Sequence, residues 1–318
     1  MKHNHKPKLI YVVLLCLLAP ALALGFSLKP KFVSSERFGE TFTAAFHGDD
    51  NSVFLFQFIF SNAGFGDGKA ACRLLAVPQG HTASNHMLRF DDDEWNYRAH
   101  SNTLDLGKCT LTADSGGIKF EANHGKINAA LHTSTVVSAL KLPTVKPGDG
   151  FYEAEVMLKG APASVSWSAK NRRRKVMGRV YMDHTRSTAK MAKLVHTIYR
   201  IRAMGKNTRL FQIAQGKQIR GWLFKSGTQS ITALTPNDVE ITPSDRTPTL
   251  MIKRAGFEAR VTAKKVLYRY KPVEAFGMMG KLASPIIGNP ETVTFIAEVT
   301  YPNGQTVPAI MERTIVDP

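Results

Sequence analysis

The residues with the clearest chemical potential lie in one short segment, where a tyrosine, an aspartate and a histidine follow closely on one another. The segment from Met177 to Thr185 reads M-G-R-V-Y-M-D-H-T. In a strand, Tyr181 and Asp183 share one face and His184 lies on the other. If Asp183 faces apolar walls inside a barrel, its pKa is raised and it can give or take a proton. The alternative is a structural Asp183 that hydrogen-bonds a neighbouring loop, with His184 in a domain interface.

A second set of residues has the character of a ligand-contacting surface. The segment from Asn51 to Ser61 reads N-S-V-F-L-F-Q-F-I-F-S, which is apolar on both faces of a strand. Such a strand is either covered on both faces or lines an apolar cavity. The candidate contacts for a hydrophobic ligand are the aromatic residues Phe56, Phe58, Trp167 and Trp222. The alternative is that these rings belong to the core.

Positive charge is concentrated in one region. The net charge is +17, and the segment from Lys170 to Lys225 contains 16 lysines or arginines and one acidic residue. Within it, His196 shares a strand face with Arg200, which predicts an anion-binding stripe or, alternatively, a solvated outer face. The region begins with a run of four cations, Arg172, Arg173, Arg174 and Lys175. This basic run predicts contact with an anionic surface, with a solvated loop as the alternative.

The first 23 residues have the order of a secretory signal peptide. A basic stretch with Lys2, Lys6 and Lys8 comes first. An apolar run from Leu9 to Ala19 follows, and Ala21-Leu22-Ala23 then offers a cleavage site. An uncleaved anchor is the alternative, because about 20 weakly polar residues can span a bilayer. We expect export to the periplasm or cell envelope.

Export bears on Cys72 and Cys109, the two cysteines that follow the targeting segment. An oxidising compartment can join them in a disulfide, and closing that loop would add about 3–4 kcal/mol. The alternative is two buried thiols in different strands. Their spacing fits no zinc site, so we expect no metal and no cofactor. The expected partners are a hydrophobic small molecule or lipid and, at the basic run, an anionic membrane surface, but no nucleic acid.

Alternating apolar and polar residues predict an almost entirely β-structured protein. Examples are Phe151 to Leu158 and Thr292 to Tyr301, which are rich in residues that favour strands. Turn sequences such as Lys146-Pro147-Gly148-Asp149-Gly150 separate these segments. We expect about 16 to 18 strands, arranged as sandwiches or barrels. The one modest helix candidate is Pro272 to Leu282.

The segment from Met177 to Thr185 resembles a signature of the superfamily of carotenoid 1,2-hydratase-like proteins and yeast survival-factor-like lipid-binding proteins. Phe56 to Asn62, followed by a glycine-rich turn, is similar to an early F-x-F-x-x-x-N strand of these proteins. Asp105 to Leu131 is similar to their mid-domain meander, and Lys281 to Phe295 to a late segment. The resemblance implies an all-β fold of two tandem lipocalin-like antiparallel β-barrels, at residues 24–187 and 188–318.

The resemblance also implies a function, with one departure. In enzymes of the family, the acid–histidine pair is usually followed by asparagine or glutamine, then tryptophan and glycine. In this sequence the pair is followed by Thr185, Arg186 and Ser187. The leading hypothesis is therefore an exported protein that binds or transports a lipid or isoprenoid in a lipocalin-like barrel. One alternative is a hydratase or cyclase that uses Asp183 as proton donor to an isoprenoid or lipid. A structural envelope protein without ligand is the third.

Overall fold

The strands of the protein form two antiparallel sheets. The computed structural model describes residues 26–62, 67–146, 149–169, 172–189, 195–205, 210–216, 219–225, 230–271 and 290–316. The strands of the first sheet are β1 (Gly39–Gly48), β2 (Val53–Ser61), β3 (Lys69–Val77), β4 (Ser84–Phe90), β5 (Asn96–Arg98), β6 (Thr103–Asp105), β7 (Cys109–Asp114), β8 (Gly117–Asn123), β9 (Ile127–Thr133), β10 (Leu140–Lys141), β11 (Tyr152–Ala169) and β12 (Arg172–Ser187). Those of the second are β13 (Val195–Ala203), β14 (Leu210–Gly216), β15 (Ile219–Lys225), β16 (Ser230–Leu234), β17 (Val239–Thr242), β18 (Thr249–Arg254), β19 (Phe257–Tyr270), β20 (Glu291–Thr300) and β21 (Thr306–Ile315).

The prediction of an all-β fold is confirmed. Two short 3-10 helices, Ala99–Ser101 and Pro236–Asp238, interrupt the strands, and no α-helix occurs among the described residues. No helix in that part of the chain is long and apolar enough to cross a membrane. The expected signal peptide and the helix candidate from Pro272 to Leu282 lie outside the described residues.

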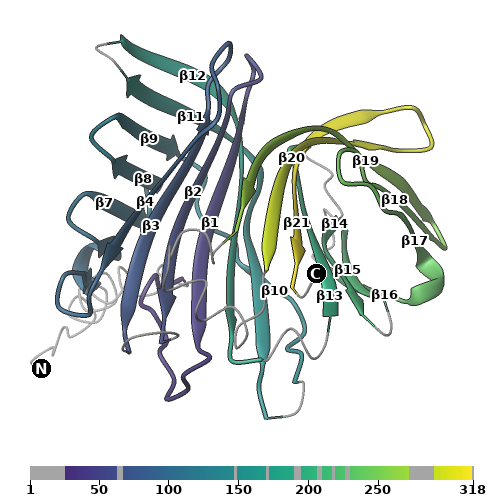
Figure 1. Cartoon of the computed structure of the whole chain (residues 1–318), viewed down its shortest axis with the longest axis horizontal. Helices are drawn as coiled ribbons and strands as arrows, with labels where there is room; N and C mark the ends of the chain where they lie inside the picture. The colour runs from purple at the N-terminus through teal and green to yellow at the C-terminus, as the bar shows by residue number, and fades with distance from the viewer. Residues whose placement is uncertain are drawn as a thin grey trace, which may run out of the picture.

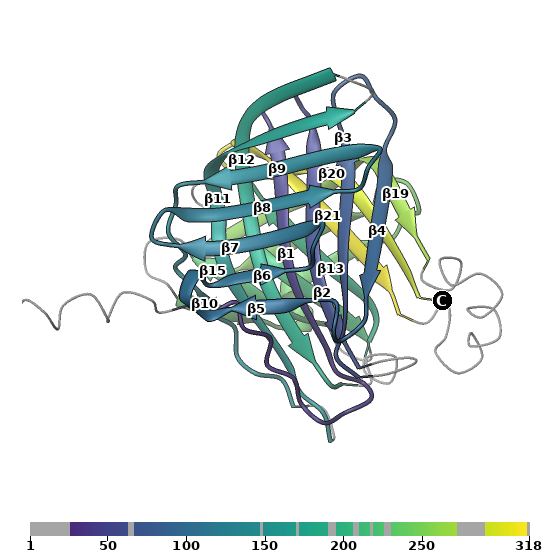
Figure 2. The same ribbon diagram turned by 90° about the vertical axis from the view of Figure 1, so that its left-hand side faces the viewer.

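The first sheet folds over onto itself. Its strand order is β4-β3-β2-β1-β12-β11-β9-β8-β7-β6-β5, with β10 paired to β11. Figure 2 shows β5 to β9 crossing in front of β1 to β4. Phenylalanines of β2 contact the opposite layer across this fold: the ring centroids of Phe58 and Phe120 are 5.3 Å apart, and those of Phe56 and Phe120 are 5.6 Å apart. Each fully buried phenylalanine contributes about 1.5–3 kcal/mol to this core.

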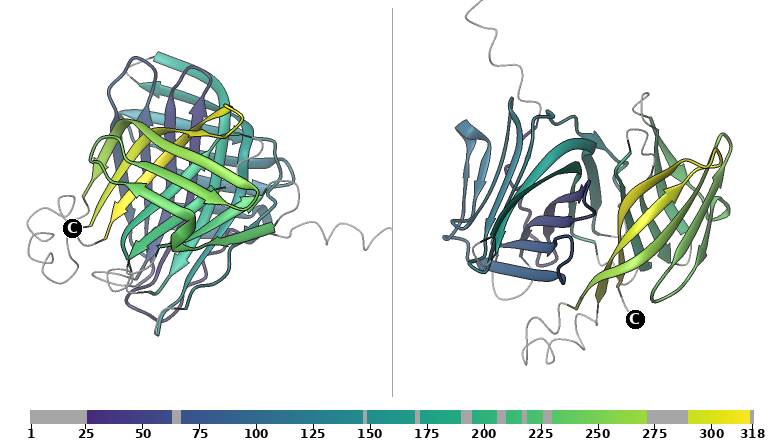
Figure 3. Two further views of the ribbon diagram at one scale, coloured as in Figure 1. Left: turned by 90° about the vertical axis from the view of Figure 1, so that its right-hand side faces the viewer. Right: turned by 90° about the horizontal axis from the view of Figure 1, so that it is seen from above.

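The second sheet curls around a smaller core. Its strand order is β16-β15-β14-β13-β21-β20-β19-β18-β17. Its inner face is lined by residues such as Ile201, Phe295 and Met311, all fully buried. Seen from above, the two curled sheets lie side by side (Figure 3). This is the arrangement of two tandem lipocalin-like half-barrels.

The two sheets pack against each other along a third core, which we call the seam. Strand β1 of the first sheet contacts β21 of the second there, and β11 contacts β13 (Figure 1). Ala45, Leu55 and Tyr181 of the first sheet share this core with Met204 and Ile310 of the second. The Phe-rich strand β2 is therefore apolar on both faces because one face enters the first core and the other enters the seam.

Candidate functional site in the seam

An ion-paired arginine crosses the seam. Arg202 on β13 donates from Nε to Oδ2 of Asp183 at 2.5 Å and from Nη2 to Oδ1 at 3.3 Å. Its Nη1 donates to Oε2 of Glu312 at 2.6 Å. All three side chains are buried. Burial opposes the charge on Arg202, but the two carboxylates outweigh it and raise the pKa of the guanidinium. Burial alone would raise the pKa of Glu312, yet Arg202 and Arg73 hold it below its ordinary value.

A row of directly opposed side chains continues from Asp183 across the first sheet. Thr43 on β1 pairs with Asp183 and with Gln57 on β2. Gln57 in turn pairs with Arg73 on β3, which pairs with Met87 on β4. Hydrogen bonds run along the row, because Gln57 donates to Thr43 at 3.2 Å and Arg73 donates to Gln57 at 2.8 Å. Strand register thus places five residues from five different strands in one line on the seam face.

The second sheet presents a matching row to the seam. Gln212 on β14 pairs with Arg200 on β13, which pairs with Glu312 on β21. Glu312 pairs with Thr294 on β20, and Thr294 with Tyr268 on β19. Each strand contributes one residue, because alternate side chains point into the second core. Polar rows therefore face each other across the seam.

Two buried polar atoms in these rows lack a hydrogen-bond partner: Nη2 of Arg73 and Oγ1 of Thr294. Both approach the same residue, because Tyr268 is the strand neighbour of Thr294 and its ring centroid lies 6.0 Å from the Arg73 guanidinium. Burial lowers the pKa of Arg73, although Glu312 opposes this effect. No carboxylate forms a salt bridge with Arg73 in the described part of the chain. A buried donor without an acceptor costs about 1–3 kcal/mol.

A hydrogen bond and an aromatic ring fix the position of the Arg73 guanidinium. Nε donates to the amide oxygen of Asn85 at 2.7 Å, and the Tyr270 ring centroid lies 4.9 Å from the guanidinium. Tyr270 is only half-buried, as is Met87 beside it. Hydrophobic residues of both sheets form the apolar part of the same seam: Leu55, Leu75, Val77, Ala83, Ile231, Leu267 and Ile296. The arrangement provides a fixed cation beside an apolar surface.

Two buried tyrosines complete the polar part of the seam. The hydroxyl of Tyr152 on β11 donates to the amide oxygen of Gln212 at 2.6 Å. Burial raises the pKa of Tyr152, although Arg200 and Gln212 oppose this. Burial and the charge of Asp183 raise the pKa of Tyr181 well above its ordinary range. Both hydroxyls therefore keep their protons near neutral pH.

The structure corrects both placements considered for the acid–histidine pair. Asp183 points into the seam, where it pairs with Arg202, rather than into a barrel or towards a loop. His184 points to the opposite face, into the first core, rather than into the interface between the sheets. There His184 stacks on Phe42, with ring centroids 4.2 Å apart. Its Nε2 and Nδ1 each lie 2.7 Å from a carboxylate, Glu40 and Glu155 respectively. Burial opposes the imidazolium, but hydrogen bonds to the two glutamates outweigh it and raise the pKa of His184.

Other candidate residues lie apart from the seam site. Phe56, Phe58 and Trp167 are buried in the first core, so their rings fill the space that a ligand there would need. His196 is exposed at the start of β13, whereas Arg200 takes part in the polar row. The side chain of Trp222 lies outside the described residues.

The basic run and the cysteines also have defined places. Arg172, Arg173, Arg174 and Lys175 form the exposed start of strand β12, paired with the end of β11, rather than a loop. This hairpin projects at the top left of Figure 1. Cys72 and Cys109 form a disulfide in the first core.

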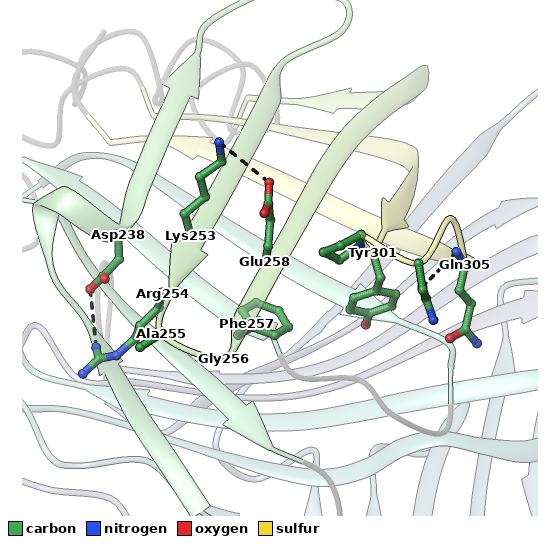
Figure 4. A pocket seen from close by; sticks show the side chains of 11 residues that line it. Asp238, Lys253, Arg254, Ala255, Gly256, Phe257, Glu258, Tyr301 and Gln305 are labelled. Carbon is green, nitrogen blue, oxygen red and sulfur yellow. Dashed lines mark hydrogen bonds and ion pairs between the residues drawn. The ribbon is translucent and has the colours of Figure 1, made fainter.

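A separate hollow lies at the hairpin ends of the second sheet. It has a volume of about 840 Å³, and Phe257 and Tyr301 are its aromatic walls (Figure 4). Its charged groups pair with one another: Lys253 with Glu258 at 3.7 Å, and Arg254 with Asp238 at 3.4 Å. Because no charge in it is left without a partner, the hollow is a weaker candidate than the seam.

The fold and the buried polar seam define a protein of two tandem lipocalin-like half-barrels. The chain is similar to a protein of Nitrosomonas europaea provisionally named AttH, with a TM-score of 0.64 and 12% identity over 88% of this chain and 93% of the other. It is also similar to kievitone hydratase from Nectria haematococca, with a TM-score of 0.51 and 11% identity over 88% of each chain. Against CghA with Sch210972 the TM-score is 0.50, with 11% identity over 91% and 94% of the two chains.

These likenesses show a shared lipocalin-like β fold. No model of a protein family matches the chain, and no curated protein matches its sequence. The wider superfamily suggested by the sequence therefore stays a prediction.

Several residues of the seam site were missed from the sequence alone. Arg73 and Thr294 lie more than two hundred residues apart in the sequence, and only the packing of the two sheets brings Arg73 to Tyr268, the strand partner of Thr294. One signal was available: Gln57 and Arg73 are polar residues in otherwise apolar strands. Buried polar residues of this kind mark places where hydrogen bonds must be supplied.

Proposed function

We propose that the protein binds a small amphiphilic molecule in the seam, with an acidic group on Arg73 and an apolar body against the surrounding aliphatic and aromatic residues. The observation that carries this proposal is the pair of buried atoms without partners, Nη2 of Arg73 and Oγ1 of Thr294. A carboxylate or phosphate would accept from Nη2 of Arg73, and an acidic group that also reached Oγ1 of Thr294 would accept from that hydroxyl. The hydrogen bonds that Arg73 donates to the amide oxygens of Asn85 and Gln57 hold the guanidinium in place for it.

The apolar part of the ligand follows from the neighbours of Arg73. Leu75 and Leu267, which are buried, and the half-buried Ile296 would pack against a lipid or isoprenoid chain that entered between the two sheets. Tyr268, Tyr270 and Met87 are half-buried at the same edge, so movement of these side chains would admit the ligand. Export to the cell envelope, as the N-terminal segment predicts, is part of the proposal, because free amphiphiles are abundant at membranes.

The seam replaces the barrel interior as the proposed ligand site. In the first core, rings of β2 contact a ring of β8, so a ligand there would have to displace several buried phenylalanines. Each displaced ring would cost about 1.5–3 kcal/mol of burial. A ligand in the seam would instead provide hydrogen bonds that two buried groups lack.

A hydratase or cyclase remains the second candidate. Its support is the likeness to a structure named kievitone hydratase, together with the enclosed polar character of the seam. Asp183 would then have to release Arg202 before it could transfer a proton, because the carboxylate accepts two hydrogen bonds from that side chain. A binder needs no such rearrangement, and we therefore rank binding first.

Native mass spectrometry of the full chain tests binding directly. The probes are a long-chain fatty acid, an isoprenoid phosphate and the methyl ester of the same fatty acid. We expect one equivalent of an acidic probe to bind, and the ester to bind more weakly. If none of the acidic probes adds to the protein at concentrations below their micelle formation, the proposed function is wrong.

A further inference from the structure

A cluster of potential metal ligands lies in the first sheet, outside the seam. The sulfurs of Cys72 and Cys109 and a ring nitrogen of His124 all lie within 4.8 Å of one another. Cys72 is on β3, Cys109 begins β7, and His124 lies in the turn between β8 and β9. Nε2 of His124 is 3.9 Å from the Cys72 sulfur. Ligands thus converge from three separate parts of the chain.

A second histidine approaches the same place from strand β4. The ring centroids of His86 and His124 are 5.6 Å apart, and the rings are inclined at 38°. Two imidazoles on one tetrahedral ion have ring centroids ~5 Å apart, given metal–nitrogen bonds of ~2 Å. His86 is therefore a neighbour of His124 whose ring would have to turn towards the sulfurs to reach the same ion, because its nitrogens are not among the ligand atoms that lie within 4.8 Å of one another. The ligand atoms that converge in the structure are two sulfurs and one nitrogen, and a reoriented His86 would add the second nitrogen.

We propose that reduction of the Cys72–Cys109 disulfide converts this cluster into a binding site for Zn²⁺. Two thiolates and two neutral imidazoles are the tetrahedral ligand set that zinc prefers. The two thiolate charges balance the charge of the ion, which matters in a site where both cysteines are buried. The sequence spacing gave no hint of this, because zinc sites are usually recognised by ligands in close pairs.

A thiol reductant supplies the electrons and protons that reduction of the disulfide requires. Two thiols of the reductant transfer two electrons and two protons to the protein disulfide, which yields two cysteine thiols and the oxidised reductant. Binding of Zn²⁺ then releases the two thiol protons to solvent. Sulfurs on a tetrahedral zinc lie ~3.8 Å apart, from zinc–sulfur bonds of ~2.3 Å. The Cα atoms of the cysteines are 6.4 Å apart, so rotation of the side chains is enough to reach this separation.

Cobalt(II), a spectroscopic substitute for zinc, tests the proposal on the full chain. After reduction with a dithiol and removal of the reductant without air, we expect one equivalent of Co²⁺ to give the visible absorption of a tetrahedral ion and a thiolate charge-transfer band. Zn²⁺ should displace it. Oxidised protein should give neither band, because its sulfurs are bonded to each other.

The variant His124→Asn keeps both cysteines and should bind Co²⁺ at least tenfold more weakly than the reduced wild type. The control His100→Asn changes an exposed histidine that is not part of the cluster, and it should bind as the wild type does. Absence of the thiolate band in reduced wild type, or equal affinity in His124→Asn, would overturn the proposal. If reduction unfolds the protein, restoration of the β circular dichroism signal by Zn²⁺ supports the site, and failure to restore it counts against it.

Discussion

The carboxylate of Asp183 and the guanidinium of Arg202 join the two sheets by two hydrogen bonds, at 2.5 and 3.3 Å. The pair links β12, an interior strand of the first sheet, to β13 of the second. Asp183 is thereby a buried anion with its partner in the other half of the molecule. This relationship bears both on how the halves hold together and on whether Asp183 can act as an acid.

The substitution Asp183→Asn separates a binder from an enzyme. If the protein only binds its ligand at Arg73, affinity should change less than tenfold, about 1.4 kcal/mol, because Asp183 does not touch the ligand. If Asp183 is the proton donor of a hydratase or cyclase, turnover should fall by about 10² or more while binding persists. Affinity and conversion of a polyene probe are measured on the same preparations. Wild-type conversion that disappears in the variant, with binding intact, would reverse our ranking.

Removal of Arg202 should destabilise the protein strongly. The variant Arg202→Met leaves Asp183 and Glu312 buried without their cation, at a cost of about 3–5 kcal/mol. The matched control is Arg37→Met, whose ion pair with Asp149 is exposed and should contribute about 1 kcal/mol or less. Urea denaturation at neutral pH measures both. Similar effects of the two substitutions would show that the seam ion pairs do not hold the sheets together.

His184 should make stability depend on pH on the alkaline side. Its folded pKa is raised by Glu155 and Glu40, despite burial, so its stabilising effect is complete below its unfolded pKa of about 6.5. The effect is lost as pH rises through the folded value. Thermal unfolding of the wild type should therefore show a fall in stability from pH 6 towards pH 9. The variant His184→Gln should lose this part of the dependence, and an unchanged profile would contradict the role of the buried imidazolium.

The basic run should draw the protein to anionic membranes. All four of its side chains are exposed at the end of the β11–β12 hairpin, two on each face of the strand, so the tip of the hairpin can approach a surface. Vesicles that contain anionic lipid should bind the protein, and about 0.5 M salt should release it, because salt screens the attraction. The double variant Arg173→Gln/Arg174→Gln should bind at least tenfold more weakly, unlike the control Lys264→Gln/Lys265→Gln. Equal binding to neutral vesicles would contradict this.

The fold was predictable because its signals are local. In β11 and β20, apolar and polar residues alternate, whereas β2 is apolar on both faces. Either pattern can be read within a single segment of sequence, and all three segments form strands. The basic run was also visible, although its strand conformation comes from pairing with β11.

The site was not predictable in the same way. The sequence places Tyr181 and Asp183 on one face, and they do share it, but which sheet covers that face depends on the packing of the two halves. Arg73 reaches the seam through pairing of β3 with β2 and then β1. Strand pairing of this kind places residues side by side that are distant in the sequence and belong to no common motif.

The central claim is that Arg73 receives an acidic group of the ligand. Titration of a fatty acid and its methyl ester against wild type, Arg73→Gln and the control Arg260→Gln, an exposed arginine, tests it most directly. We predict that the acid binds wild type and the control at least tenfold more tightly than the ester, as a charge-assisted hydrogen bond implies, and that Arg73→Gln removes this preference while retaining its β circular dichroism signal. Equal affinity of wild type for acid and ester, or an unchanged preference in Arg73→Gln, would contradict the account.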